Sequence, residues 1–190
     1  MAQQQKNIEI EFRSRFDLAK YKELKEFLDA NAEDRGEDDK DVYFFLFPNK
    51  LLKVVNNVSK NNAKIVLKLN KIGKGSDFEE IEVPITQKHF ERAVKMFIAL
   101  KIGDHMHSFQ KRHNYLYKGV ELALKWSEIW GYHLELEIVV TDQNQKAAAE
   151  SKIFAVTKDL GIKIMTDEEL KEFTEKAEAD YKKDKKNGDS

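Results

Sequence analysis

Three segments of the sequence each carry two glutamates that are separated by one apolar residue. The pairs are Glu9 and Glu11, Glu80 and Glu82, and Glu135 and Glu137. In an extended strand, residues two positions apart lie on the same face. Each segment therefore presents two carboxylates on one side and apolar residues on the other. One such strand is typical of a sheet with a solvated face, whereas three of them favour a shared acidic surface.

Basic residues follow the same alternation in the strand-like segments. They are Arg13, Lys53, Lys64, Lys68 and Arg112. If the sheet closes on itself, the carboxylates meet in an interior, where desolvating each charge costs several kcal/mol. Oxygen ligands without Cys or His select Mg²⁺ or Mn²⁺. The basic side chains could then hold an anion that the cation also contacts, such as a polyphosphate.

Alternating apolar and polar residues predict eight strands, and helical periodicity predicts four helices. The strands are expected at 8–16, 42–47, 51–57, 64–71, 78–85, 106–118, 120–126 and 132–140, and the helices at 18–30, 87–101, 143–160 and 167–183. We expect a charged loop at 31–40, a hairpin turn at 73–76 and a capping box that starts at Thr166. Trp126 and Trp130 flank a turn and are expected to pack in the core or at a rim.

Strands in series, with few helices between them, favour an antiparallel sheet over a parallel α/β fold. The predicted fold class is α+β, an eight-stranded closed antiparallel β-barrel with helices packed outside. Residues 1–190 form one domain in this interpretation. Its core covers about 8–165, followed by the C-terminal helix at about 167–183 and a frayed tail.

The composition narrows the class of protein. Charged residues make up 35% of the 190 residues, but the formal net charge is −1, which argues against a nucleic-acid binder. The chain has no apolar run long enough to span a membrane, no signal peptide pattern and no cysteine. We therefore expect a cytoplasmic protein that acts on a small molecule, with no nucleic-acid or membrane partner. The sequence leaves a homodimer open.

The segment Glu9-x-Glu11-x-Arg13 resembles the ExExK signature of the CYTH superfamily, the triphosphate tunnel metalloenzymes. Other segments resemble further elements of the superfamily in the same order. They are Asp41-x-Tyr43-Phe44, Leu52-Lys53, Leu67-Lys68, Glu80-x-Glu82, Arg112-x-x-Tyr115 and Gly131 with Glu135-x-Glu137. The resemblance covers about residues 8–165.

This resemblance implies an eight-stranded tunnel in which basic side chains bind a triphosphate and glutamates hold one or two Mg²⁺ or Mn²⁺ ions. The metal-side residues would be Glu9, Glu11, Glu80, Glu82, Glu135 and Glu137. The phosphate-side residues would be Arg13, Lys53, Lys68 and Arg112, with Lys125 as a further candidate. Glu9, Glu11 and Lys68 would be the catalytic residues.

Three positions depart from the superfamily pattern. Val55 and Gln110 stand where basic residues are expected, and Lys125 stands where an Asp is expected. We interpret Lys125 as compensation for the two lost cations, provided that it faces the tunnel. The alternative is a register shift of one residue, which would turn Lys125 outward.

The sequence therefore predicts a metal-dependent hydrolase of inorganic triphosphate or of a small triphosphorylated compound. A class IV adenylate cyclase, which forms cyclic AMP and pyrophosphate from ATP, is one alternative. A non-catalytic polyphosphate or nucleotide binder is the other, because of the three departures. The identity of the triphosphate and the preferred metal are left open.

Overall fold

The computed structural model describes residues 8–69, 77–78 and 80–188. The strands are β1 (Ile8–Arg15), β2 (Glu33–Glu37), β3 (Lys40–Leu46), β4 (Leu51–Asn57), β5 (Asn62–Lys68), β6 (Asp77–Phe78), β7 (Glu80–Ile85), β8 (His105–Tyr117), β9 (Val120–Ser127) and β10 (Gly131–Val140). The helices are α1 (Leu18–Asn31), α2 (Phe90–Ala99), α3 (Lys146–Asp159) and α4 (Asp167–Gly188), with short 3₁₀ turns at Gln87–His89 and Gln143–Gln145.

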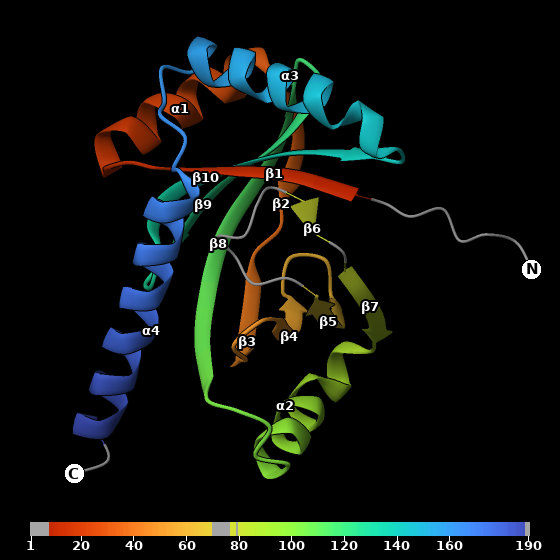
Figure 1. Ribbon diagram of the computed structural model, residues 1–190, viewed down its shortest axis with the longest axis vertical. Coiled ribbons are helices and arrows are strands. Elements are labelled where there is room, and N and C mark those ends of the chain that lie inside the picture. The colour runs from red at the N-terminus through yellow and green to blue at the C-terminus, as the bar shows by residue number, and fades with distance from the viewer. Residues whose placement is uncertain (1–7, 70–76, 79, 189–190) are drawn as a thin grey trace, which may run out of the picture.

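The strands form one curled antiparallel sheet, with hydrogen-bonded order β6-β1-β10-β9-β8-β3-β4-β5-β7 and β2 paired to β8 (Figure 1). The predicted α+β class is thus observed, but the predicted closed eight-stranded barrel is not confirmed. β6 and β7 form the two ends of the order, and only residue 79 separates them in the sequence. β6 pairs with β1 at two positions, whereas β7 pairs with β5. Because residues 77–78 and 80–85 are divided between β1 and β5, they do not form one strand that pairs with both and closes the sheet.

Two predictions of local structure need further comment. The expected charged loop at 31–40 contains β2, which pairs with β8 through a register shift between Asp34 and Gly36. A charged, irregular strand lacks the alternation that sequence patterns detect. The expected turn at 73–76 lies outside the described residues, and α4 extends beyond residue 183 to Gly188.

α1, α2 and α3 cover the outer face of the sheet, whereas α4 lies across one end of it (Figure 1). α1 and α3 pack on β1, β8, β9 and β10 through a cluster that includes Leu28, Leu124 and Ile153. α2 packs on β3, β4 and β5 through Phe90 and Val94. Outward apolar residues such as Phe45, Val54 and Leu124 are thereby buried, whereas Ile81 and Val83 of β7 stay exposed. The alternating polar residues point inward.

Side chains define the helix starts. The carboxylate of Asp17 accepts a hydrogen bond from the backbone N–H of Lys20 at 2.8 Å, which caps α1. The predicted capping box of α4 is present, because Thr166 and Glu169 each accept from the other's backbone N–H, at 3.1 and 2.8 Å. Within the described residues, no helix combines the length and apolar character that crossing a bilayer requires.

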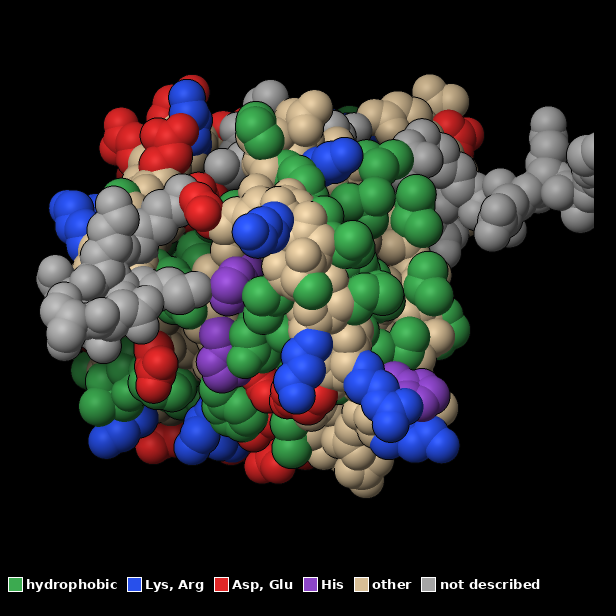
Figure 2. Space-filling model, turned by 90° about the horizontal axis from the view of Figure 1, so that it is seen from below, with side chains coloured by type: hydrophobic (Ala, Val, Ile, Leu, Met, Phe, Trp, Pro, Cys, Tyr) green, Lys and Arg blue, Asp and Glu red, His purple; other side chains and the backbone are tan. Residues whose placement is uncertain are grey.

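The face shown in Figure 2 is the lower end of the molecule in Figure 1, where α2 lies. Apolar side chains there are mixed with charged ones. α2 contributes the exposed side chains of Met96 and Ile98, and Leu100 follows its end. Apolar atoms scattered among charges are usual on protein surfaces and indicate no site.

We predict that Leu28→Ala lowers the free energy of unfolding by about 2–5 kcal/mol, because it leaves a cavity between α1 and the sheet. Leu28 is 0% exposed, whereas Leu18, on the same helix, is 45% exposed. The control Leu18→Ala should cost less than half as much. Urea denaturation of both variants checks this, and equal losses would contradict the assignment of the core.

Candidate active site

A cavity of about 220 Å³ occupies the inside of the curled sheet. One water molecule needs roughly 10–15 Å³, so the cavity has room for a much larger ligand. We call this cavity the charged chamber. Its acidic lining residues are Glu9, Glu11, Glu80, Glu82, Glu135 and Glu137, and its basic ones are Arg13, Lys40, Lys53, Lys64, Lys68, Arg112 and Lys125. The structure thus brings all the predicted site residues together around one space, and their chemical roles stay predictions.

Lys68 is surrounded by carboxylates from two strands. Its Nζ atom lies 2.6 Å from Glu80 Oε1, 3.5 Å from Glu11 Oε2 and 3.7 Å from Glu9 Oε2. Burial lowers the pKa of Lys68, but the attraction of Glu11 and Glu80 outweighs it and raises the pKa above its usual value. Lys68 therefore stays charged and joins the acidic residues of β1 to those of β7.

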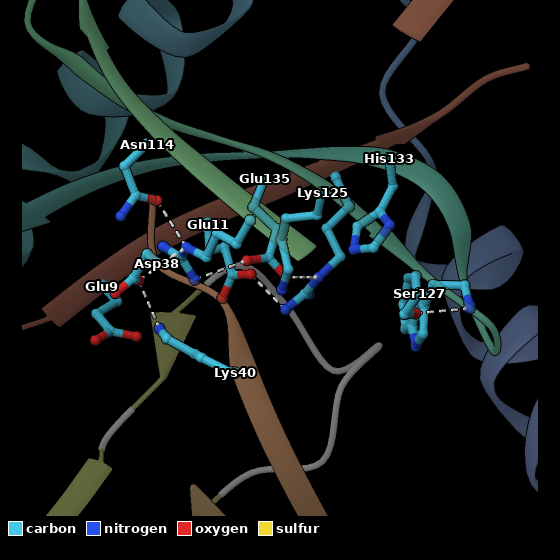
Figure 3. A network of polar contacts seen from close by, with 12 residues as sticks. Glu9, Glu11, Asp38, Lys40, Asn114, Lys125, Ser127, His133 and Glu135 are labelled. Carbon is cyan, nitrogen blue, oxygen red and sulfur yellow. Dashed lines mark hydrogen bonds and ion pairs between the residues drawn. The ribbon is translucent and has the colours of Figure 1, made fainter. Parts of the chain in front are cut away.

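Glu135 on β10 shows the opposite arrangement to Lys68, because here one carboxylate faces three cations (Figure 3). Its Oε1 atom lies 3.1 Å from Lys125 Nζ and 3.2 Å from Arg13 Nε, and its Oε2 atom lies 3.6 Å from Arg112 Nη1. Burial alone would raise the pKa of Glu135, but Lys125, Arg13 and Arg112 hold it well below its usual range. Arg13 also pairs with Glu11, so the two acidic groups are linked.

Asp38 and Lys40 belong to this network, and the sequence analysis missed both. Asp38 pairs with Lys40 at 2.8 Å and with Arg112 Nε at 3.3 Å, and it accepts a hydrogen bond from Asn57. Lys40, Asn57 and Lys60 together outweigh burial and hold the pKa of Asp38 below its usual range. Lys40 lies two residues before Val42 and therefore on the same strand face. This signal was not used because residues 31–40 were assigned to a loop.

His133 and Trp130 also line the charged chamber and were not predicted as site residues. His133 Nδ1 lies 3.0 Å from the carbonyl oxygen of Gly131, which can only accept, so Nδ1 carries the proton. Burial and the nearby Lys125 lower the pKa of His133 to about 3, so the ring is neutral at pH 7. Its position two residues before Glu135 on one strand face was the available signal.

Lys53 differs from the other basic residues of the charged chamber. Among the described residues, no ion pair or hydrogen bond joins its ammonium group to a protein partner. Burial and the nearby Lys68 lower the pKa of Lys53 to about 8. Glu80 and Glu11 attract this ammonium without pairing with it. A buried ammonium that lines a cavity and forms no ion pair is suited to an incoming anion.

Glu137 lines the charged chamber among other glutamates. Burial, with Glu9, Glu11 and Glu135 nearby, raises its pKa to about 8. Burial and Glu80 raise the pKa of Glu9 as well. Adding positive charge would relieve both effects, and carboxylate oxygens are the donors that Mg²⁺ and Mn²⁺ prefer. Glu9, Glu11 and Glu137 therefore fit a divalent cation chemically, although no three acidic or imidazole groups of the described residues already stand in a coordinating arrangement.

The three departures from the superfamily pattern all face inward. Val55 packs with Val42 and Val66 in an apolar cluster on the inner face. Gln110 and Lys125 both line the charged chamber, and Lys125 pairs across the sheet with His133 and Arg112. The alternative of a one-residue shift that turns Lys125 outward is therefore wrong.

The sequence matches the model of the CYTH domain over residues 7–170. The curled antiparallel sheet with its charged interior and this match agree, and the chain belongs to the CYTH family. No curated protein sequence matches it significantly.

Solved structures with the same fold come from several organisms. The PH1012 protein from Pyrococcus horikoshii OT3 is 26% identical, with a TM-score of 0.67 over 85% of this chain and 99% of that one. A conserved hypothetical protein from Pyrococcus furiosus is 26% identical, with a TM-score of 0.65 over 85% and 94%. HpAC1 from Hippeastrum, described as having a dominant triphosphatase activity, is 17% identical, with a TM-score of 0.57 over 83% and 89%. This last likeness supports the fold alone.

We predict that Glu137→Gln stabilises the metal-free protein increasingly as the pH rises from 5 to 9. A carboxyl group whose folded pKa is raised to about 8 binds its proton more tightly in the folded state than in the unfolded state. The wild type therefore loses stability as the pH rises from the usual Glu pKa toward 8, and the glutamine variant does not. Denaturation with a chelator present, at several pH values, measures the difference. A constant difference would contradict the burial of Glu137 among carboxylates.

Proposed function

We propose that this protein is a divalent-metal-dependent hydrolase that cleaves a phosphoanhydride bond of inorganic triphosphate or of a small triphosphorylated compound. The observation that supports it most is the charged chamber, where seven basic residues face six glutamates. Proteins do not bury this many charges for stability, because replacement by apolar residues is often neutral or favourable. A polyanion and cations bound together would use both sets of charges.

The basic residues would bind and orient the triphosphate. Lys53 would contact a phosphate directly, and Arg13 and Arg112 would do so from positions where glutamates fix their side chains. A Mg²⁺ or Mn²⁺ ion held by Glu9, Glu11 and Glu137 would supply positive charge that stabilises the phosphate oxygens in the transition state. Lys68 would stabilise the same developing charge beside Glu80.

The reaction has a simple balance. The oxygen of a water molecule forms a bond to the terminal phosphorus, and the bond from that phosphorus to the bridging oxygen breaks. The bridging oxygen leaves with the remaining diphosphate, and the water proton passes to solvent or to a nearby carboxylate. Inorganic phosphate and a diphosphate are the products, with no oxidant or reductant involved.

The proposal assigns Lys125 a compensating role. Its side chain is 7% exposed and lies beside Glu135, and it lines the charged chamber together with Gln110 and Val55. An ammonium at this position restores part of the positive charge that these two neutral residues do not supply.

We predict that turnover requires a divalent cation and releases inorganic phosphate. Tripolyphosphate, ATP and thiamine triphosphate should be tested with Mg²⁺, with Mn²⁺ and with chelator, and Glu9→Gln should lower the rate at least about a hundredfold. Glu175→Gln, on the exposed side of α4, is the matched control. Wild-type turnover in chelator would contradict the proposal. Cyclic AMP with pyrophosphate would indicate a cyclase instead, and saturable binding without any product a binder.

We predict that Lys53→Met weakens triphosphate binding by about 1.5–3 kcal/mol, the value of a hydrogen bond to a charged group. Lys111→Met makes the same change on β8, at an exposed position, and should leave affinity unchanged. Isothermal titration with imidotriphosphate, which is not hydrolysed, measures both. Equal affinities in the two variants would exclude Lys53 from the phosphate site.

A further inference from the structure

Two arginines of β1 lie against two aromatic rings that come from distant parts of the chain. The Arg13 Cζ atom lies 5.7 Å from the centre of the Trp130 ring, and the Arg15 Cζ atom lies 3.8 Å from the centre of the Phe173 ring. The two rings meet edge to face, with centroids 4.9 Å apart. We call these four residues the arginine–aromatic cluster. A guanidinium within about 6 Å of a ring centre is attracted to the face of that ring.

The arginine–aromatic cluster extends from the charged chamber to the surface of the protein. Arg13 is 6% exposed, and it lines the charged chamber together with Trp130. Arg15 is exposed, and Phe173 is partly buried on α4. Among the described residues, none of those that line the charged chamber belongs to α4. The cluster therefore connects a helix outside the chamber to an arginine inside it.

Backbone hydrogen bonds fix the surroundings of the cluster. Met165, which comes shortly before α4, donates its backbone N–H to the carbonyl oxygen of Arg13 at 2.8 Å. Arg15 Nε donates to the carbonyl oxygen of Trp130 at 3.0 Å, and the backbone N–H of Trp130 donates to Ser127 Oγ at 3.1 Å. The backbone of β1 is thus attached both to the start of α4 and to the turn that carries Trp130. The direction of the Trp130 ring then depends on the side chains around it.

The Trp130 ring restrains Arg13 in a way that a further carboxylate could not. Arg13 Nη2 already pairs with Glu11, and Arg13 Nε lies 3.2 Å from Glu135 Oε1. A guanidinium has five N–H donors, and each additional carboxylate would occupy donors that a phosphate needs. An aromatic ring attracts the cation without accepting one of these hydrogen bonds in their plane. The remaining donors of Arg13 therefore stay available to an incoming anion.

From this arrangement we propose that Phe173 is a positioning residue, which holds the Trp130 ring over Arg13 and thereby fixes the direction of the guanidinium that binds phosphate. This inference rests on the proposed function, in which Arg13 contacts the triphosphate. Arg15 supports the arrangement through its contact with the Phe173 ring. A displacement of about 1 Å at a group that holds the substrate can cost about a hundredfold in rate, so the restraint has a functional consequence.

The test is the substitution Phe173→Leu, which keeps an apolar side chain on α4 and removes the ring. Isothermal titration with imidotriphosphate and Mg²⁺ should show a loss of affinity of at least about fivefold. Phe173→Tyr retains the ring and should keep the affinity of the wild type. Phe154→Leu is the matched control, because the Phe154 ring on α3 contacts Phe12, the neighbour of Arg13 on β1, with centroids 5.1 Å apart. It should leave affinity unchanged.

A double-mutant cycle separates positioning from attachment of α4. Arg13→Lys keeps the charge but has no planar fork for a ring to direct, so Phe173→Leu should cause no further loss of affinity in this background. If Phe173 only attached α4 to the sheet, the two losses would add. Arg15→Met is a second variant at an exposed position and should weaken binding by at least about twofold even if Phe173→Leu fails to fold.

Unchanged affinity in Phe173→Leu, equal losses in Phe173→Leu and Phe154→Leu, or additive losses in the cycle would overturn the inference alone. If Phe173→Leu does not fold, unchanged affinity in Arg15→Met would overturn it. Failure of the wild type to bind imidotriphosphate would overturn the proposed function as well.

Discussion

Charges of both signs are removed from bulk water inside the curled sheet, and the rest of the structure depends on how they are balanced. Taking an ion out of water costs several kcal/mol, and the cost is recovered only when opposite charges and hydrogen bonds are well placed. Lys68 serves this purpose among Glu9, Glu11 and Glu80, and Glu135 does so among three cations. The balance is incomplete at Lys53 and at Glu137, and these are the positions where an anion and a cation would complete it.

The fold makes this arrangement possible by separating two kinds of residue along every strand. Outward residues join α1, α2 and α3 in apolar clusters, and inward residues meet across the chamber. The apolar core that supports the inner face therefore lies on the other side of the sheet. α4 follows a different rule, since aromatic and polar contacts hold it across one end of the sheet.

Strand alternation was enough to predict which residues face inward, because a two-residue period is a local property of the chain. Glu9, Lys68 and Glu135 were found in this way. Asp38 was not, because it lies in the short segment between β2 and β3, and its partners Lys40 and Arg112 are chosen by the packing of the sheet. The balance of charge could not be predicted either. Lys68 forms ion pairs, whereas Lys53 lies near Glu80 and Glu11 without pairing with them. This difference depends on distances between strands far apart in the sequence.

Whether the curled sheet closes into a barrel could not be predicted from the sequence either. Eight strand patterns are compatible with closure, but closure depends on how the end strands divide their pairing. Here β6 and β7 divide one stretch of chain between β1 and β5. The place of Phe44 and Trp130 in the wall of the charged chamber was missed for a similar reason, since both look like ordinary core residues until the sheet is curled.

The most direct test of this account is a crystal structure with Mn²⁺ and imidotriphosphate, in which anomalous scattering identifies the metal. The account predicts phosphate oxygens within hydrogen-bonding distance of Lys53 Nζ and a Mn²⁺ peak bound by carboxylates among Glu9, Glu11 and Glu137. Triphosphate bound outside the charged chamber, or within it but away from both Lys53 and these glutamates, would contradict it.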